Sequence, residues 1–289
     1  DVLVREQPDG VLVYGDTNST LAGALAAVKL HIPVAHVEAG LRSFNRAMPE
    51  EINRVVTDHL ACLHFCPTEA AVRNLADEGL RDQVHLVGDV MYDALCFNIG
   101  IAVRNSTILA RWNLTPRQYL LATVHRAENT DDPARLSAIL QALRSLAEAG
   151  HCVVFPVHPR TRQRLQACLP NPPRNLLLLE PASYLDMLRL EQQAQAVLTD
   201  SGGVQKEACW LRVPCVTLRD QTEWVETVTS GWNRLAGADP GVILEKVAEA
   251  TQSRPPLAAH DDFAPAAPQI VEILLRGGAF CSPSRSGSA

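Results

Sequence analysis

The segment TDSGGVQKEA at 199–208 joins an expected buried strand to an expected helix through a turn of small residues. The apolar run 196–199 before it is typical of a parallel strand. The two glycines of Ser201–Gly203 let the backbone approach a ligand closely. A helix that begins there presents unpaired N–H groups to an anion. Glu207 follows one turn later, where its carboxylate could accept hydrogen bonds from sugar hydroxyls. A turn without a ligand explains this segment alone equally well.

Two other expected strands end in a histidine close to an arginine. His125 and Arg126 follow the strand 119–124, and His158 and Arg160 follow the strand 153–157. Histidine exchanges protons near neutral pH, and arginine binds two phosphate oxygens at once. Each pair alone fits a structural loop. Three polar strand ends in one sheet together favour an anionic ligand.

Acidic residues hold corresponding positions in the first third of the chain. Asp16 follows the expected strand 11–14, where it either faces a ligand or caps the next helix. Glu38 ends the strand 34–37, with Arg42 as a possible salt-bridge partner. Glu50 and Glu51 begin a helix, where acids complement the helix dipole. Adjacent helical side chains point about 100° apart, so at most one of these two faces a site.

Strands and helices alternate along the whole chain, a rhythm typical of parallel sheets. Helices are expected at 21–30, 50–60, 69–78 and 133–149, and further strands at 63–66, 84–87, 176–179 and 215–218. We predict an α/β protein with two doubly wound Rossmann-like domains facing each other across a cleft. The predicted parts are 1–105, an incomplete N-terminal domain with the acidic residues; 106–265, the second domain; and 266–289, a C-terminal helix and a disordered tail.

Composition limits the function classes. The 289 residues are 47% hydrophobic and 20% charged, as in globular proteins, and the net charge of −6 argues against a nucleic-acid partner. No apolar run approaches the ~18 residues of a membrane span. No signal peptide is visible, and the eight cysteines fit a reducing compartment, so we expect a cytoplasmic protein. Cys62 and Cys66 lack a second pair, so we expect no metal site.

Seven segments together are more specific than any one of them. They are GDTNST at 15–20, HVEAGLRS at 36–43, MPEEINR at 48–54, TVHRAEN at 123–129, PVHPR at 156–160, TDSGGVQKEA at 199–208 and LRDQTEW at 218–224. With these segments in this order, the chain resembles the non-hydrolysing UDP-N-acetylglucosamine 2-epimerases.

The resemblance implies a glycosyltransferase-B type fold with the nucleotide bound mainly to the second domain. It implies reversible conversion of UDP-GlcNAc to UDP-ManNAc, through elimination of UDP to 2-acetamidoglucal and re-addition. It also implies no cofactor, a homodimer, and a supply of ManNAc for surface polysaccharide.

The resemblance assigns roles residue by residue. Asp16, Glu38 and Glu50 would act at the sugar, and which of them removes the C2 proton stays open. His125 would help to neutralise the departing diphosphate. The expected nucleotide contacts are Arg126 and the backbone of Ser201, Gly202 and Gly203 for phosphate, Glu207 for ribose, and His158 and Arg219 nearby.

The sequence differs from the family's pattern at its start. The family begins with a strand and a Gly-Thr-Arg-Pro-Glu loop that this sequence lacks. We therefore expect an N-terminally truncated chain that turns over poorly until the upstream segment is restored. The alternatives are a hydrolysing epimerase, another transferase of the same fold, and an inactive nucleotide-sugar-binding fragment.

Overall fold

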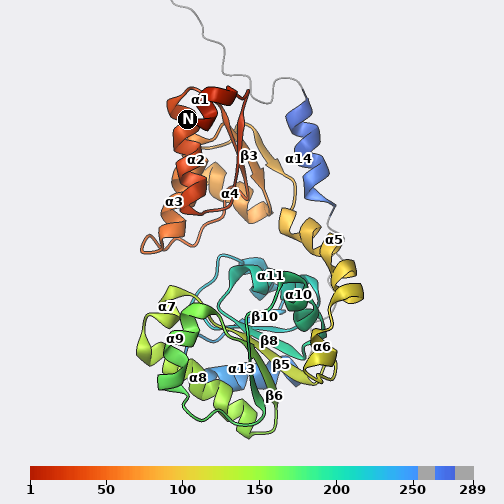
Figure 1. The fold of residues 1–289 in the computed structure, drawn as a ribbon. Coiled ribbons are helices and arrows are strands. Elements are labelled where there is room, and N and C mark those ends of the chain that lie inside the picture. Colours follow the sequence, from red (N-terminus) through yellow and green to blue (C-terminus); the bar gives the residue numbers. More distant parts are fainter. Residues whose placement is uncertain (253–263, 277–289) are drawn as a thin grey trace, which may run out of the picture. The chain divides into compact units, whose positions relative to one another are not determined.

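The computed structural model describes residues 1–252 and 264–276 (Figure 1). The chain forms two compact units, Asp1–Asp93 with Asp262–Ala289, and Ala94–Asp261. Each unit is an α/β structure around a parallel sheet, as the sequence predicts. The division differs from the predicted boundaries, because residues 94–105 group with the second unit and the C-terminal segment groups with the first. The tail 277–289, which we predicted to be disordered, lies outside the described residues.

The first unit contains a sheet with the strand order β1-β2-β3-β4, and all its pairs are parallel. Its strands are β1 (Val11–Tyr14), β2 (Val34–Val37), β3 (Leu63–Cys66) and β4 (Val84–Leu86). Its helices are α1 (Val2–Glu6), α2 (Asn18–Lys29), α3 (Pro49–Leu60), α4 (Glu69–Asp77) and α14 (Ala266–Leu275). The four strands lie where their apolar runs predict them, and α1 was not predicted.

The C-terminal helix α14 completes the core of this first unit. Ile270 packs in one buried cluster with residues of β2 and β3, including Ala35 and Phe65. Asp93 accepts hydrogen bonds from the first backbone N–H groups of α14, at Ala266 (3.1 Å) and Ala267 (2.7 Å). Figure 1 shows α14, in blue, beside the red and orange elements of the first unit. Through these contacts, α14 becomes part of the first unit, although it lies near the end of the sequence.

The second unit has a sheet with the order β10-β9-β8-β5-β6-β7, again all parallel. Its strands are β5 (Tyr119–Thr123), β6 (Cys152–Pro156), β7 (Leu176–Leu179), β8 (Ala196–Thr199), β9 (Cys215–Thr217) and β10 (Asn233–Leu235). The chain runs from β5 outward to β7 and then returns to β8 on the other side of β5. Ligands of such sheets bind at this switch point, beyond the carboxyl ends of the strands.

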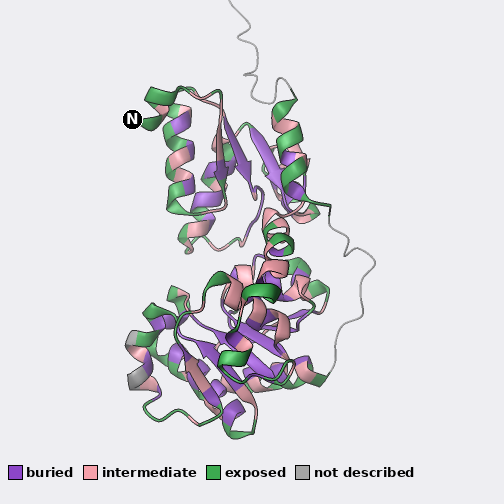
Figure 2. Ribbon diagram, turned by 45° about the vertical axis from the view of Figure 1, so that its right-hand side comes forward, coloured by how far each residue is buried: buried purple, intermediate pink, exposed green. Residues whose placement is uncertain are grey.

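Helices cover both faces of the second sheet. The helices of this unit are α6 (Ile108–Arg111), α7 (Ala127–Thr130), α8 (Pro133–Glu148), α9 (Pro159–Cys168), α10 (Tyr184–Gln193), α11 (Gly202–Trp210), α12 (Val225–Thr229) and α13 (Pro240–Gln252). The helix α5 (Val90–Asn105) begins in the first unit and continues into the second. Along β5, Leu120 and Ala122 pack with α8 and α13, whereas Tyr119 and Leu121 pack with α6, α10 and α11. Alternate residues of a strand point to opposite faces, so both faces are buried (Figure 2). Among the described residues, no helix combines the length and apolar character needed to span a bilayer.

Candidate active site

Asp16 and Glu38 follow neighbouring strands of the first sheet. Tyr14 pairs with Val37 in the β1–β2 register, so both strands end at the same edge. A Cβ atom built on Gly15 would lie 3.2 Å from Oε2 of Glu38. The Glu38 carboxylate therefore lies against the backbone next to Asp16. The structure brings these two predicted sugar-side residues together.

Asp16 does not cap the following helix. Thr17 caps α2 instead: its hydroxyl accepts the Thr20 N–H (3.2 Å), and the Thr20 hydroxyl accepts the Thr17 N–H (3.2 Å). The Asp16 carboxylate instead pairs with the Arg54 guanidinium on α3, and its side chain is 32% exposed. The capping interpretation of Asp16 is therefore wrong: its carboxylate is ion-paired with Arg54 and partly exposed, and it does not accept a helix N–H.

Glu38 has an unusual backbone conformation. Its φ angle is 72°, and that of Gly40 is 81°. The N–H groups of Glu38 and Ala39 both donate to the Phe65 carbonyl at 3.1 Å. A left-handed non-glycine residue costs roughly 1–3 kcal/mol and is commonest at functional sites. Arg42, the possible salt-bridge partner of Glu38, pairs with Asp58 and Glu78 instead, so the structural interpretation of Glu38 is contradicted.

The two acids at the start of α3 have different environments. Glu51 is buried and accepts hydrogen bonds at 2.9 Å from the Ser43 N–H, the Ser43 hydroxyl and the Phe44 N–H. It also accepts from Arg54 at 2.8 Å. Glu51 thus fixes the loop before α3, and Glu50, half-buried on the same turn, remains the predicted sugar-side residue. Arg54 was not among the predicted site residues, although its i+3 spacing from Glu51 is a helical pairing signal.

Asp200 joins the two strand ends at the switch point of the second unit. Its buried carboxylate accepts the N–H groups of His125 and Arg126, each at 3.0 Å, and the Asn129 amide at 3.1 Å. Asp200 follows β8, and His125 and Arg126 follow β5. The Asp200 carboxylate therefore holds the loop that carries His125 and Arg126 next to the turn that begins at Ser201. This role of Asp200 was not predicted from the sequence.

His125 and His158 lie side by side, with ring centroids 5.5 Å apart. Burial lowers the pKa of His125, and the positive charges of Arg126 and Arg160 and the His158 ring lower it further, whereas Asp200 opposes this shift. Nδ1 of His158 accepts the Arg160 N–H at 3.2 Å, so the neutral ring carries its proton on Nε2. The structure thus brings these two predicted histidines together.

The predicted phosphate turn begins α11. Ser201 caps this helix, and its backbone N–H donates to Oγ1 of Thr199 at 3.0 Å. A Cβ atom on Gly202 would lie 2.7 Å from Oε1 of Glu223 and 3.1 Å from Nε1 of Trp224. Only glycine fits here without displacing these groups. Gly203, the next residue of the turn, is half-buried.

Arg219 is linked to this turn through Glu223. Its guanidinium is buried and donates to Oε2 of Glu223 at 3.0 Å. Glu207, on α11, is also buried, and its Oε1 accepts the Tyr184 hydroxyl at 3.1 Å. Burial raises the pKa of Glu207. The predicted nucleotide residues thus gather around the β5–β8 switch point and the first turns of α11.

Cys62 and Cys66 differ in environment. Cys62 is exposed and Cys66 is buried. Across residues 1–252 and 264–276, no group of three or more His, Cys, Asp or Glu side chains is arranged to hold a metal ion.

Comparison with known proteins identifies the family. The model of the UDP-N-acetylglucosamine 2-epimerase family matches residues 1–275. A UDP-N-acetylglucosamine 2-epimerase homolog of Methanococcus maripaludis is 54% identical over 255 residues, which is 86% of this chain and 70% of the relative. The UDP-2,3-diacetamido-2,3-dideoxy-D-glucuronate 2-epimerase of Pseudomonas aeruginosa is 50% identical over 258 residues, which is 85% of this chain and 68% of that protein.

A solved structure agrees with the sequence relatives. The UDP-GlcNAc 2-epimerase of Methanocaldococcus jannaschii, in complex with UDP-GlcNAc and UDP, superposes with a TM-score of 0.87 at 44% sequence identity. The match covers 94% of this chain and 77% of that one. The chain therefore belongs to the UDP-N-acetylglucosamine 2-epimerase family, a family of isomerases.

Proposed function

We propose that the chain interconverts UDP-GlcNAc and UDP-ManNAc by inverting C2 of the sugar. The observation that carries this proposal is the β5–β8 switch point, where Asp200 fixes His125 and Arg126 beside the Ser201–Gly203 turn. The M. jannaschii relative was solved with UDP-GlcNAc and UDP, which supports a nucleotide sugar as the ligand. The family resemblance supports a homodimer and a supply of ManNAc for surface polysaccharide.

In the proposed first step, UDP is eliminated across C1 and C2. A sugar-side carboxylate takes the C2 proton, and the C2–H electron pair becomes the C1=C2 double bond. The C1–O bond breaks, and its electron pair leaves with UDP. This step gives 2-acetamidoglucal. Asp16, Glu38 and Glu50 are the proposed acids and bases, and their grouping at one edge of the first sheet supports this role for Asp16 and Glu38.

In the second step UDP adds back to C1, and a carboxylic acid delivers a proton to the opposite face of C2. Diphosphate leaves and returns readily only where its charge meets preorganised donors. His125, Arg126 and the backbone of the Ser201–Gly203 turn are the proposed donors. Within this turn the N–H groups of Gly202 and Gly203 would contact the diphosphate, because the Ser201 N–H already donates to Thr199. Glu207 would accept hydrogen bonds from the ribose hydroxyls. His158 and Arg219 would lie near the nucleotide.

A second candidate substrate differs in the sugar. The P. aeruginosa relative, named for UDP-2,3-diacetamido-2,3-dideoxy-D-glucuronate, is 50% identical, against 47% for the M. jannaschii UDP-N-acetylglucosamine 2-epimerase. The same elimination would operate on this substrate, because C1 and C2 carry the same groups. The sugar-side residues would then also have to accept a carboxylate.

Product analysis separates these reactions. The purified chain is incubated with each nucleotide sugar in turn, and the products are identified by NMR. We expect UDP-ManNAc at equilibrium with UDP-GlcNAc and no free sugar. Free ManNAc with UDP would mean hydrolysis, and turnover only with an added acceptor would mean transfer. Selective turnover of the diacetamido-glucuronate would reassign the substrate. Tight binding with no turnover of either sugar, both by the chain and after the family's N-terminal strand and Gly-Thr-Arg-Pro-Glu loop are added to it, would contradict the proposed enzyme.

A further inference from the structure

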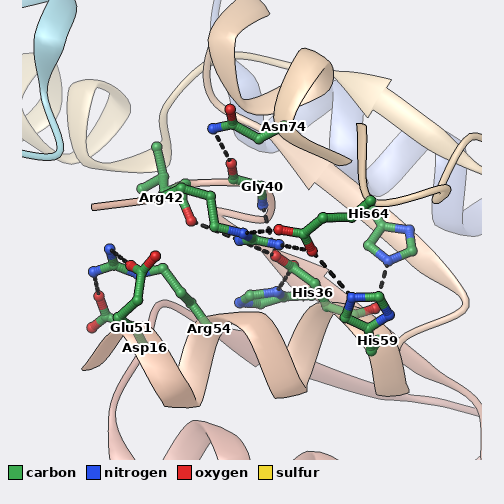
Figure 3. A network of polar contacts seen from close by, with 12 residues as sticks. Asp16, His36, Gly40, Arg42, Glu51, Arg54, His59, His64 and Asn74 are labelled. Atoms are coloured by element: carbon green, nitrogen blue, oxygen red, sulfur yellow. Dashed lines mark hydrogen bonds and ion pairs between the residues drawn. The ribbon is translucent and has the colours of Figure 1, made fainter. Parts of the chain in front are cut away.

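One buried carboxylate, that of Asp58 on α3, connects the elements that carry the three sugar-side acids. Figure 3 shows its partners His36, Gly40 and Arg42 within this network. It accepts hydrogen bonds from Nδ1 of His36 (2.6 Å), the Gly40 N–H (3.1 Å) and Nη1 of Arg42 (2.7 Å). Asp58 and His36 are fully buried. Burial alone would raise the pKa of Asp58, but the bonds from His36 and Arg42 lower it, so the carboxylate is ionised.

The first connection leads to Asp16. His36 lies within β2, and its second ring nitrogen, Nε2, is 2.8 Å from the carbonyl oxygen of Gly15. A carbonyl only accepts, so Nε2 is the donor. Gly15 immediately precedes Asp16, whose own carbonyl accepts the Asn53 amide from α3 at 2.9 Å. The carbonyl groups of Gly15 and Asp16 are thus both hydrogen-bonded, one to His36, which bonds to Asp58 of α3, and the other to Asn53 of α3.

The second connection leads to Glu38. The Gly40 N–H donates directly to Asp58, and the Gly40 carbonyl accepts the Asn74 amide at 2.9 Å. These bonds hold the turn in which Glu38 and Gly40 are both left-handed. Such a conformation persists only where the surroundings fix it. The third connection is α3 itself, which carries Glu50 in its first turn and Asp58 near its end.

The outer side of the same network leads through Arg42 to Glu78, at the end of α4. Arg42 also donates to both carboxylate oxygens of Glu78, at 2.6 and 2.8 Å, and His59 contacts Glu78 at 3.1 Å. Buried ion pairs contribute little net stability compared with well-packed apolar groups. The placement of Asp58 at the two turns that carry Asp16 and Glu38 therefore indicates a role in geometry.

We propose that Asp58 is a positioning residue, which sets the relative positions of Asp16, Glu38 and the helix that bears Glu50 through His36 and the Gly40 N–H. This inference rests on the proposed C2 epimerisation.

Asp58→Asn and Glu78→Gln form a matched pair for the test. Both replace a carboxylate that pairs with Arg42 by its amide, and only Asp58 also contacts His36 and Gly40. We expect Asp58→Asn to lower kcat at least ~30-fold with KM changed less than ~3-fold. Glu78→Gln should keep kcat within ~3-fold of the parent chain. His36→Gln, which breaks the link to Asp58, serves as the second variant if Asp58→Asn does not fold.

Amide hydrogen exchange gives a readout that needs no turnover. Glu38 and Ala39 donate to Phe65 and not to Asp58, so their exchange reports on the turn as a whole. We expect Asp58→Asn to speed their exchange at least ~10-fold and Glu78→Gln to leave it unchanged. Equal kcat and equal exchange in the two variants would overturn the positioning role. A parent chain that binds but never exchanges C2–H, even after the family's N-terminal strand and loop are added to it, would instead refute the proposed function, while the amide exchange would still decide the role of Asp58.

Discussion

Burial determines the charge state of His125. Its pKa is lowered by burial and by neighbouring positive groups, so the free protein holds a neutral ring at neutral pH. A diphosphate placed beside the ring would favour the imidazolium and raise that pKa. If His125 faces the diphosphate, ligand binding must therefore take up a proton.

The first prediction concerns this proton. UDP-GlcNAc is a suitable ligand, since its diphosphate has no proton to lose near neutral pH. Affinity should rise as the pH falls toward the ordinary histidine pKa of ~6.5, by at most about tenfold per pH unit. Calorimetry in buffers of different ionisation enthalpy counts the protons. His125→Gln should reduce the uptake, and His31→Gln, at an exposed position of the first unit, should not. Equal uptake in parent and His125→Gln proteins would exclude His125 as the group that titrates.

Gly202 gives the second prediction. A methyl group there meets Glu223 and Trp224 at 2.7 and 3.1 Å, whereas one on Gly23 meets Val13 at an ordinary 3.5 Å. Gly202→Ala should lower UDP affinity at least ~10-fold and the free energy of unfolding by about 1–3 kcal/mol. Gly23→Ala, inside α2, should raise that free energy by roughly 0.5–1 kcal/mol and leave UDP affinity unchanged. Titration calorimetry and urea unfolding measure both quantities. Unchanged affinity in Gly202→Ala would argue against a phosphate at this turn.

At the scale of elements, the strands that position the candidate site were predictable. Runs such as Val34–Val37 and Ala196–Thr199 are continuously apolar because a parallel strand is buried on both faces. The strand β10 was missed, because Asn233 and Arg234 interrupt its short run. Boundaries at strand ends were predicted within a residue or two. The site predictions attached to those ends depended on the same runs.

The side-chain network of the first unit was not predictable from local pattern. His36 and Asp58 are 22 positions apart, and Arg42 and Glu78 are 36 apart. Their pairing depends on how α3 and α4 pack on the sheet, which periodicity does not specify. For the same reason, the sequence left Arg42 as only a possible partner of Glu38 and gave no sign of Asp58 or Glu78. Thr17 is the N-cap of α2 because its hydroxyl accepts the Thr20 N–H. The preference of N-cap positions for Asp, Asn, Ser and Thr does not decide among the neighbouring residues of this segment.

The turn after β2 gives the third prediction. A Cβ on Gly40 would lie 2.3 Å from the Ala71 carbonyl oxygen of α4, whereas one on Gly79 meets nothing within 4 Å. Both residues have a positive φ, of 81° and 85°. Gly79→Ala should therefore lower the free energy of unfolding by roughly 1 kcal/mol, and Gly40→Ala by at least ~3 kcal/mol. Denaturant titration compares the two. Similar losses would mean that α4 does not pack against this turn as described.

At the scale of the whole molecule, a helix near the end of the sequence packs on the unit formed by its first residues. The helix α14 packs on the first unit although more than 170 residues separate Ala266 from its capping Asp93. We predicted three successive segments and did not place α14 in the first unit. A domain boundary read from sequence does not show that a later helix packs on an earlier domain. The described part of the first unit is therefore discontinuous in sequence.

The fourth prediction tests that arrangement. Ile270 is buried against β2 and β3, whereas Leu275, at the end of α14, is 78% exposed. Ile270→Ala should lower the stability of the first unit by about 2–5 kcal/mol through the cavity that it leaves. Hydrogen exchange should then accelerate in β2 and β3 and stay unchanged in β5 and β8. Leu275→Ala should behave like the parent chain. Equal acceleration in both units, or none, would contradict the division into two units.

Epimerisation at C2 requires that the enzyme break and remake the C2–H bond of a UDP sugar. The most direct test is proton NMR of UDP-GlcNAc incubated with the chain in D₂O. We predict that the C2 proton signal disappears as deuterium enters, and that UDP-ManNAc signals grow with deuterium at C2. Saturable binding of UDP-GlcNAc with the C2 proton fully retained, both by the chain and after the family's N-terminal strand and Gly-Thr-Arg-Pro-Glu loop are added to it, would contradict the proposed chemistry. The protein would then be a nucleotide-sugar-binding protein without this reaction.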